Sequence, residues 1–157
     1  MTIRQKSLAL PGVVALTHLV HRLGGYVSLV SNRDGSYRDA SGSTLAATIA
    51  NLKQQNIVFD QVILANYKTS QHPSDKNPRF NAVIYGHYDS HEMVWSKRLP
   101  PHQVIAYFGD NIQDFPRFKQ AAVDALPDDS KTYEVFGAGY FILPNPMYGS
   151  WEANRYH

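Results

Sequence analysis

The chain of 157 residues contains no cysteine. Disulfide bonds, thiolate catalysis and cysteine-based zinc sites are therefore excluded, and the redox state of the protein's compartment stays undetermined. No apolar run reaches the roughly 20 residues that a membrane-spanning helix needs, so we predict no membrane span. Positive charge is barely in excess, with 15 Lys and Arg against 13 Asp and Glu, and no basic run occurs. We therefore expect no nucleic-acid partner.

The first residues partly resemble a secretion signal. Arg4 and Lys6 precede an apolar stretch that extends to Leu16. Pro11 and Gly12 interrupt this stretch early, and no small-residue cleavage site follows it. We therefore assign the stretch to the fold and keep a signal peptide as the lesser alternative. As written, the chain is expected to be cytoplasmic.

Hydrophobic residues make up 43% of the chain, close to the globular average, which argues against global disorder. Asn77 and Pro78 predict a helix start, with Asn77 as the N-cap and Pro78 at the first helical position. Apolar residues at helical spacing predict helices over 11–23, 45–52 and 77–88. Short apolar runs predict buried strands over 26–30, 61–65, 104–108 and 140–143. Polar stretches predict connections over 31–43, 66–77 and 89–102.

Four short strands separated by helices predict an α/β fold, in which a mainly parallel sheet is covered by helices on its faces. The sequence has no internal repeat and no second domain is indicated, so we expect one domain over 1–157. In open sheets of this type, ligands bind beyond the carboxyl ends of the strands. Chemistry is therefore expected from the residues that follow the predicted strands.

Polar residues with complementary chemistry follow two of these strands. Ser31 follows the first strand, Asp110 and Asp114 follow the third, and Lys76 precedes a helix between them. A serine hydroxyl can donate to a phosphate oxygen, a lysine supplies a positive charge, and Mg²⁺ prefers carboxylate ligands. Phosphoryl transfer needs these groups, because charge spreads over the phosphoryl oxygens.

Each feature taken singly also has a structural explanation. A Gly-Asp-Asn turn after a strand is common, Ser31 and Asn32 can cap a loop, and Lys76 can be a solvated charge. The combination and its order in the chain are what favour a phosphate site.

This order resembles the second, third and fourth motifs of the haloacid dehalogenase (HAD) superfamily. Residues 30–33 resemble the second motif, 76–80 resemble Lys-x-x-Arg-Phe, and 109–115 resemble the metal-binding loop. Residues 141–152 look like the carboxyl end of its non-specific acid phosphatases. That group includes bacterial outer-membrane lipoprotein phosphatases and plant vegetative storage proteins, and the resemblance extends over residues 11–152.

The resemblance implies a three-layer Rossmann-like fold and magnesium-dependent hydrolysis of phosphomonoesters through a phosphoaspartyl intermediate. It implies that Ser31 and Lys76 bind the phosphoryl group, with Asn32 and Arg33 beside them. Asp110 and Asp114 would hold Mg²⁺.

Aromatic residues near the family's phosphate pocket would also allow stacking on a nucleobase, so 5′-nucleotides are candidate substrates. Tyr148 fits either this role or packing, whereas packing is the better interpretation of Trp151.

The family's nucleophile lies in an Asp-x-Asp-x-Thr motif at the end of its first strand. No Asp-x-Asp occurs in this chain, and Asp128 and Asp129 are adjacent instead. We therefore expect the first strand and the following cap segment to be missing, magnesium binding to be weakened, and the chain to be inactive by itself. A non-catalytic relative that acts as a binding, storage or structural protein is the alternative.

In the superfamily the first strand lies between the strands that match 26–30 and 104–108. Its absence would either let these two strands pair or leave two open edges, and open edges pair with other chains. We therefore expect a homo-oligomer or a repacked fold, and a subunit that borrows a strand from another chain is a third possibility. Family members are often periplasmic or outer-membrane anchored, so the compartment stays open.

Overall fold

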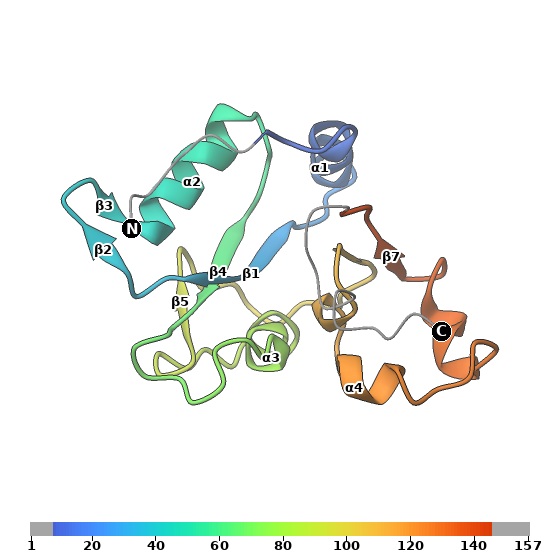
Figure 1. The fold of residues 1–157 in the computed structure, drawn as a ribbon. Coiled ribbons are helices and arrows are strands. Elements are labelled where there is room, and N and C mark those ends of the chain that lie inside the picture. The colour runs from blue at the N-terminus through green and yellow to red at the C-terminus, as the bar shows by residue number, and fades with distance from the viewer. Residues whose placement is uncertain (1–7, 146–157) are drawn as a thin grey trace. The chain divides into compact units, whose positions relative to one another are not determined.

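The computed structural model describes residues 8–145 (Figure 1). The chain divides into two compact units, Met1–His102 and Gln103–His157. That residues 1–157 form one domain stays a prediction. Among residues 8–145, no helix has the length and apolar character needed to cross a membrane.

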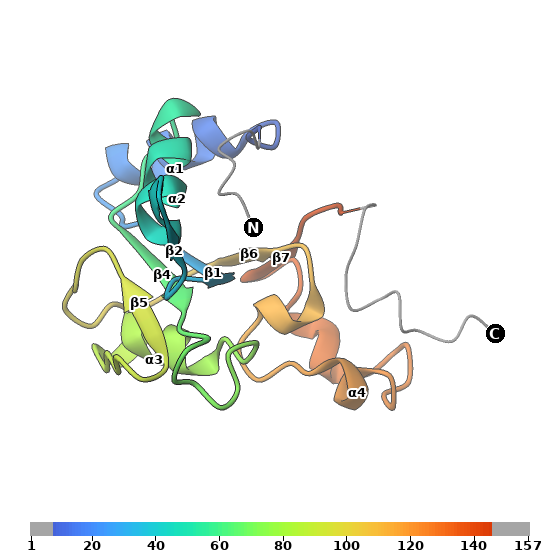
Figure 2. The same cartoon turned by 60° about the vertical axis from the view of Figure 1, so that its left-hand side comes forward.

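The first unit alternates helices and strands. Its elements are α1 (Val13–Arg22), β1 (Ser28–Asp34), β2 (Arg38–Asp39), β3 (Gly42–Ser43), α2 (Thr44–Gln54), β4 (Gln61–Ala65), α3 (Asn77–Tyr85) and β5 (Met93–Trp95). The helices α1 and α2 lie on one side of the β1–β4 pair and α3 lies on the other (Figures 1 and 2).

Strand β4 is the centre of the first unit, and all five of its residues are buried. It pairs in parallel with β1, where Leu29 lies opposite Val62, and antiparallel with β5, where Trp95 lies opposite Ile63. An unbroken apolar run is typical of a strand covered on both faces, which is why the sequence predicts β4 with the correct ends.

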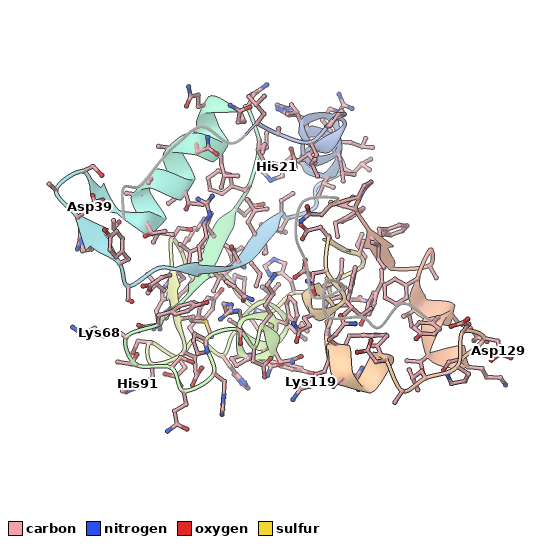
Figure 3. The ribbon with its side chains drawn as sticks, in the orientation of Figure 1. His21, Asp39, Lys68, His91, Lys119 and Asp129 are labelled. Atoms are coloured by element: carbon pink, nitrogen blue, oxygen red, sulfur yellow. The ribbon has the colours of Figure 1, made fainter. Side chains whose placement is uncertain are left out.

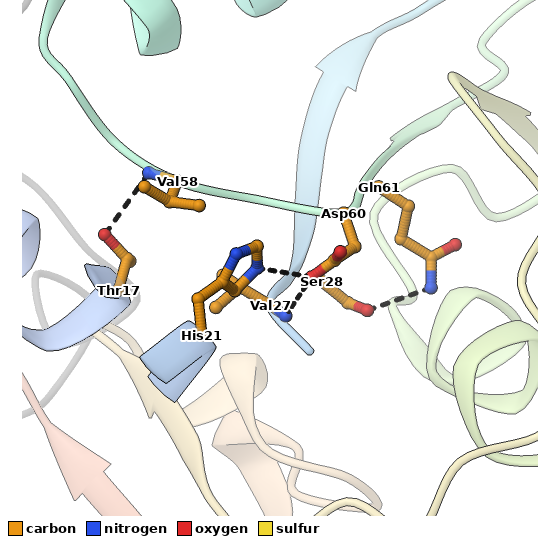
Figure 4. Close-up of polar contacts among 7 residues, drawn as sticks. All are labelled: Thr17, His21, Val27, Ser28, Val58, Asp60 and Gln61. Atoms are coloured by element: carbon orange, nitrogen blue, oxygen red, sulfur yellow. Dashed lines mark hydrogen bonds and ion pairs between the residues drawn. The ribbon is translucent and has the colours of Figure 1, made fainter. Parts of the chain in front are cut away.

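A side-chain network joins α1 to the amino ends of the two parallel strands (Figure 4). The Oδ2 atom of Asp60 accepts from the backbone N–H of Val27 at 2.8 Å and lies 2.8 Å from Nε2 of His21. The buried Gln61 donates from Nε2 to Oγ of Ser28 at 2.9 Å. These bonds satisfy polar groups that burial would otherwise leave without partners.

The second unit contains β6 (Tyr107–Gly109), a 3₁₀ helix (Ile112–Asp114), α4 (Gln120–Val123), a second 3₁₀ helix (Lys131–Val135) and β7 (Tyr140–Ile142). Strands β6 and β7 are parallel, with Phe108 opposite Phe141. The ring of Phe115 is buried and lies 5.0 Å from that of Phe136 and 5.2 Å from that of Tyr140, measured between centroids. Aromatic packing therefore replaces an aliphatic core here.

The α/β class is confirmed, because helices alternate with strands that pair in parallel as β1–β4 and β6–β7. The four predicted strands exist, but within the described residues they form two separate parallel pairs instead of one sheet. Within residues 8–145, strand β1 pairs in parallel with β4 alone, and strand β6 pairs with β7 alone. Each strand therefore keeps one unpaired edge in its own unit.

Several predicted boundaries are wrong. The connection 31–43 holds the end of β1 and the hairpin β2–β3, and the connection 89–102 holds β5, because short ladders form without apolar periodicity. The predicted strand 104–108 is shifted to Tyr107–Gly109, and the side chain of Ile105 is 85% exposed. Helix α3 ends at Tyr85 instead of 88, because Gly86 takes a left-handed conformation with φ of 71° that ends the helix.

Candidate functional site

The carboxyl end of β1 contains a bulge at the residues that were predicted to follow the strand. Ser31 lies opposite Leu64, but the next partner of Ala65 is Asp34, so two residues of β1 are inserted. The inserted residues are Asn32 and Arg33. A bulge redirects side chains and is common beside functional sites, so this one sets the direction of the candidate residues.

The bulge leaves the hydroxyl donor of Ser31 available. The Oγ atom of Ser31 accepts from the backbone N–H of Arg33 at 3.2 Å. Within residues 8–145, no group accepts a hydrogen bond from the Ser31 hydroxyl. The exposed Arg33 reaches Oγ1 of Thr48 at 3.5 Å. A hydroxyl held by its acceptor side and open on its donor side is suited to an anionic oxygen.

Lys76 is the N-cap of α3, whereas the sequence predicted Asn77 in that place. The cap is shifted by one residue because the side chain of Asp75 already accepts from the backbone N–H of Asn77, at 2.9 Å. Pro78 is consequently the second helical residue. Lys76 therefore places its charge at the positive end of a helix, where anions are favoured.

The buried Arg79 connects this helix to the β1 bulge. Its guanidinium donates from Nη2 to Oδ1 of Asn32 and from Nη1 to the carbonyl of Pro73 at 3.2 Å. Asn32 in turn donates from Nδ2 to the carbonyl of Ser74 at 3.1 Å. The segment that precedes Lys76 is thus held against the strand end that carries Ser31.

Burial affects the ionisation of Arg79. Desolvation lowers the pKa of Arg79, and electrostatic interactions with Asp75, Tyr67 and Glu92 raise it only in part. The family motif contains this arginine, but sequence spacing assigned it no role. Burial of a charged residue cannot be read from spacing, so its contribution becomes visible only in the fold.

A hollow of about 250 Å³ lies between β1, β4 and α2 in the first unit. Its lining is mostly apolar, with polar groups from Ser31, Arg33, Thr48 and Asn51. Its polar groups thus come from the carboxyl end of β1 and from α2, and the rest of its lining is aliphatic.

In the second unit, Asp110 directly follows β6, as predicted. The Oδ2 atom of Asp114 accepts from the backbone N–H groups of Asp110 and Asn111 at 3.0 and 3.2 Å. The side chain of Asn111 accepts from the N–H of Gln113 at 3.0 Å, which completes a capping box. Asn145 donates from Nδ2 to Oδ2 of Asp110.

Gly109 is required by this loop. A Cβ atom at position 109 would lie 2.3 Å from the Cβ of Asp114 and 2.8 Å from its Oδ2. Only glycine therefore allows the strand end to approach the carboxylate that organises the turn.

These residues fit a magnesium ion in part. Mg²⁺ commonly takes one or two carboxylates together with water and substrate oxygens, and Asp110 is a carboxylate of that kind. Asp114 uses Oδ2 to bind the backbone, which favours a role in shaping the loop. Within residues 8–145, no group of three His, Asp or Glu side chains could hold a metal ion.

The predicted site residues are distributed over both units. Ser31, Asn32, Arg33 and Lys76 lie at the strand end and helix start of the first unit, and Asp110 and Asp114 share one turn of the second. Tyr148 lies outside the described residues. Among the groups not predicted, Arg79 and Asn145 make direct contacts to these residues.

The described residues thus contain a strand end with a serine, a helix start with a lysine and an acidic turn after a parallel strand, in an α/β fold. The family model described as HAD superfamily, subfamily IIIB (acid phosphatase) matches residues 1–151. The chain therefore belongs to this acid phosphatase family, whose substrates are small phosphoesters. The superfamily generally uses Mg²⁺. A comparison with the solved structures gives no significant match.

Proposed function

We propose that this chain is a scaffold for phosphomonoester hydrolysis that binds the phosphoryl group through Ser31 and Lys76. The observation that supports it most is the open hydroxyl donor of Ser31, on a bulge tied to the Lys76 segment through Asn32 and Arg79. The family match adds the reaction class.

The proposed roles follow from the chemistry of each group. The hydroxyl of Ser31 donates to a phosphoryl oxygen, and the ammonium of Lys76 neutralises its charge at the amino end of α3. Arg33 is exposed, belongs to the lining of the hollow and supplies a second positive charge. Tyr148 contacts the substrate, for which 5′-nucleotides are the proposed class.

The proposed metal ligand in the second unit is Asp110. Mg²⁺, when bound, supplies charge neutralisation to the phosphoryl oxygens. Asp114 supports the ligand by fixing the turn, and Asn145 orients the carboxylate of Asp110. Because few carboxylates are grouped in the described residues, we expect weak magnesium affinity.

The proposed mechanism of the complete site is attack by an aspartate on phosphorus, which gives a phosphoaspartyl enzyme that water then hydrolyses. The 157 residues contain no Asp-x-Asp, so they supply no counterpart of that aspartate. We therefore propose that residues 1–157 by themselves bind phosphate but turn over phosphomonoesters negligibly. The same absence favours the second candidate, a relative that binds or stores without catalysis.

Titration with inorganic phosphate, followed by amide chemical shifts, tests the binding function. We expect Ser31→Ala and Lys76→Ala each to weaken phosphate binding by about tenfold or more, because each removes a hydrogen bond or charge to an anion. Lys68→Ala is the matched control, since Lys68 is an exposed lysine of the loop before α3 (Figure 3). Equal affinity in the three variants and the parent chain would contradict the proposal.

We also propose that the unpaired edge of β1 mediates a homo-oligomer or accepts a strand from another chain. Strand β1 has β4 as its one partner in the described residues, and an open edge is a template for pairing. Size-exclusion chromatography with light scattering should show a species larger than 17.7 kDa. A monomer at all concentrations would exclude the oligomer.

A further inference from the structure

Arg79 is a buried charged side chain whose charge is compensated only in part, by electrostatic interaction with Asp75 and Glu92. The residue is 1% exposed, and no carboxylate of residues 8–145 lies within ion-pair distance of its guanidinium. Its two side-chain hydrogen bonds go to neutral oxygens, the amide of Asn32 and the carbonyl of Pro73. Its Nε atom is buried and has no hydrogen-bond partner in the described structure.

Such an arrangement is costly for the fold. Burying a cation whose charge is only partly compensated is unfavourable, and a buried donor without an acceptor adds to that cost. The lowered pKa of Arg79, caused by desolvation, agrees with this cost. The number of hydrogen bonds does not by itself require the charge, since a neutral amide also has two N–H donors.

The position of Arg79 relates the charge to the proposed phosphate site. Through Asn32 the guanidinium is bonded to the residue next to Ser31, and through Pro73 it is bonded to the segment that leads to Lys76. The backbone N–H of Arg79 itself donates to the carbonyl of Lys76 at 3.0 Å. One side chain therefore touches both segments that carry the proposed phosphate ligands.

We infer that Arg79 is a positioning residue that sets the spacing between Ser31 and Lys76, and that a phosphoryl anion bound by them compensates its buried charge. This inference rests on the proposed phosphate-binding function. In this inference Arg79 strengthens phosphate binding through its hydrogen-bonded neighbours and through its electrostatic field. It does not contact the phosphoryl group directly.

Phosphate titration of variants of the full chain distinguishes the effect of the Arg79 charge from the effect of its hydrogen bonds. Arg79→Gln removes the charge and keeps a side-chain donor, whereas Arg79→Lys keeps the charge and loses the two-pronged donor geometry. Arg22→Gln is the control, because it changes the net charge equally at an exposed position on α1. We expect a loss of affinity of about tenfold or more in Arg79→Gln, a smaller loss in Arg79→Lys, and less than about a twofold change in Arg22→Gln.

Each possible outcome of these titrations supports or overturns the proposed role of Arg79. Unchanged phosphate affinity in Arg79→Gln, together with a loss in Ser31→Ala, would overturn this inference and leave the proposed function standing. An equal loss in Arg79→Gln and Arg79→Lys would overturn the assigned role of the charge. Absence of phosphate binding in the parent chain would overturn both proposals.

A second variant keeps the test valid if Arg79→Gln fails to fold, as judged by circular dichroism. Asn32→Ala breaks the bond between the guanidinium and the β1 bulge while the charge stays in place. We expect weaker phosphate binding and shifted amide signals in the Lys76 segment, which lies 42 residues or more away in sequence. Unchanged affinity and unchanged signals would overturn the positioning role.

Discussion

The two units hold their candidate residues in different ways. In the first unit, the bonds that fix the site join residues distant in sequence, such as Asn32 to Arg79 at a separation of 47 and Asn32 to Ser74 at 42. In the second unit, Asp114 binds the backbone of residues three and four positions before it. The candidate phosphate-binding residues thus depend on the folded core, whereas the backbone of the acidic turn is held locally by Asp114, with one distant bond from Asn145 to the side chain of Asp110.

The two units also differ in how many of their residues are buried. All five residues of β4 are buried, and β1 pairs with this strand on both sides of its bulge. The second unit is centred on one buried phenylalanine, Phe115, among aromatic rings. A destabilising substitution in the core should therefore disturb the candidate residues of the first unit. A substitution in the Asp110 turn should disturb only the second unit.

The largest effect is expected from Ile63→Ala in β4. Ile63 is fully buried, and truncation of a buried isoleucine costs about 3 kcal/mol of unfolding free energy. Hydrogen exchange should show loss of protection in β1 and β4, with little change in the Asp110 turn. Leu23→Ala, at a residue that is 78% exposed, is the control and should have a small effect. Equal loss of protection in both units would contradict the comparison.

A smaller effect is expected from Gly109→Ala in the second unit. The new methyl group would meet Asp114 at 2.3 Å, and the forced shift should cost about 2 kcal/mol. Amide shifts should change over residues 109–114 and stay constant in β4. Gly139→Ala is matched to it, because a Cβ there meets only the carbonyl of Ile105, at 3.6 Å. Equal effects of the two substitutions would show that the turn does not require Gly109.

The smallest effect is expected from Asp114→Asn. The side-chain oxygen and its geometry remain, but the charge that strengthens two backbone hydrogen bonds is lost, at a cost of about 1 kcal/mol. Amide exchange of Asp110 and Asn111 should accelerate by about fivefold. Asp128→Asn, at an exposed position, should leave both rates unchanged. Constant exchange in Asp114→Asn would assign the carboxylate to another role, such as metal binding.

Sequence patterns predicted the features that depend on local composition. Strand β4 was predicted with its observed ends, because a continuous apolar run marks a fully buried strand. The position of Asp110 directly after a strand was predicted, because a glycine followed by polar residues marks a turn.

Features that depend on distant partners could not be predicted in this way. Strand β1 continues through polar residues because Ala65 pairs with Asp34 beyond the bulge and its carbonyl accepts from Gly35 at 2.8 Å. The role of Arg79 depends on Asn32, a residue 47 positions away. The family match extends over residues 1–151 and agrees with the resemblance inferred from the motifs.

The proposed function gives residues 1–157 phosphate-binding and magnesium-binding groups but no nucleophile. The most direct test is hydrolysis of p-nitrophenyl phosphate with and without added Mg²⁺, compared between the parent chain and Asp110→Asn. We predict negligible turnover in both proteins, because no aspartate of an Asp-x-Asp motif is present to accept the phosphoryl group. Magnesium-dependent hydrolysis by the parent chain that Asp110→Asn abolishes would contradict the claim.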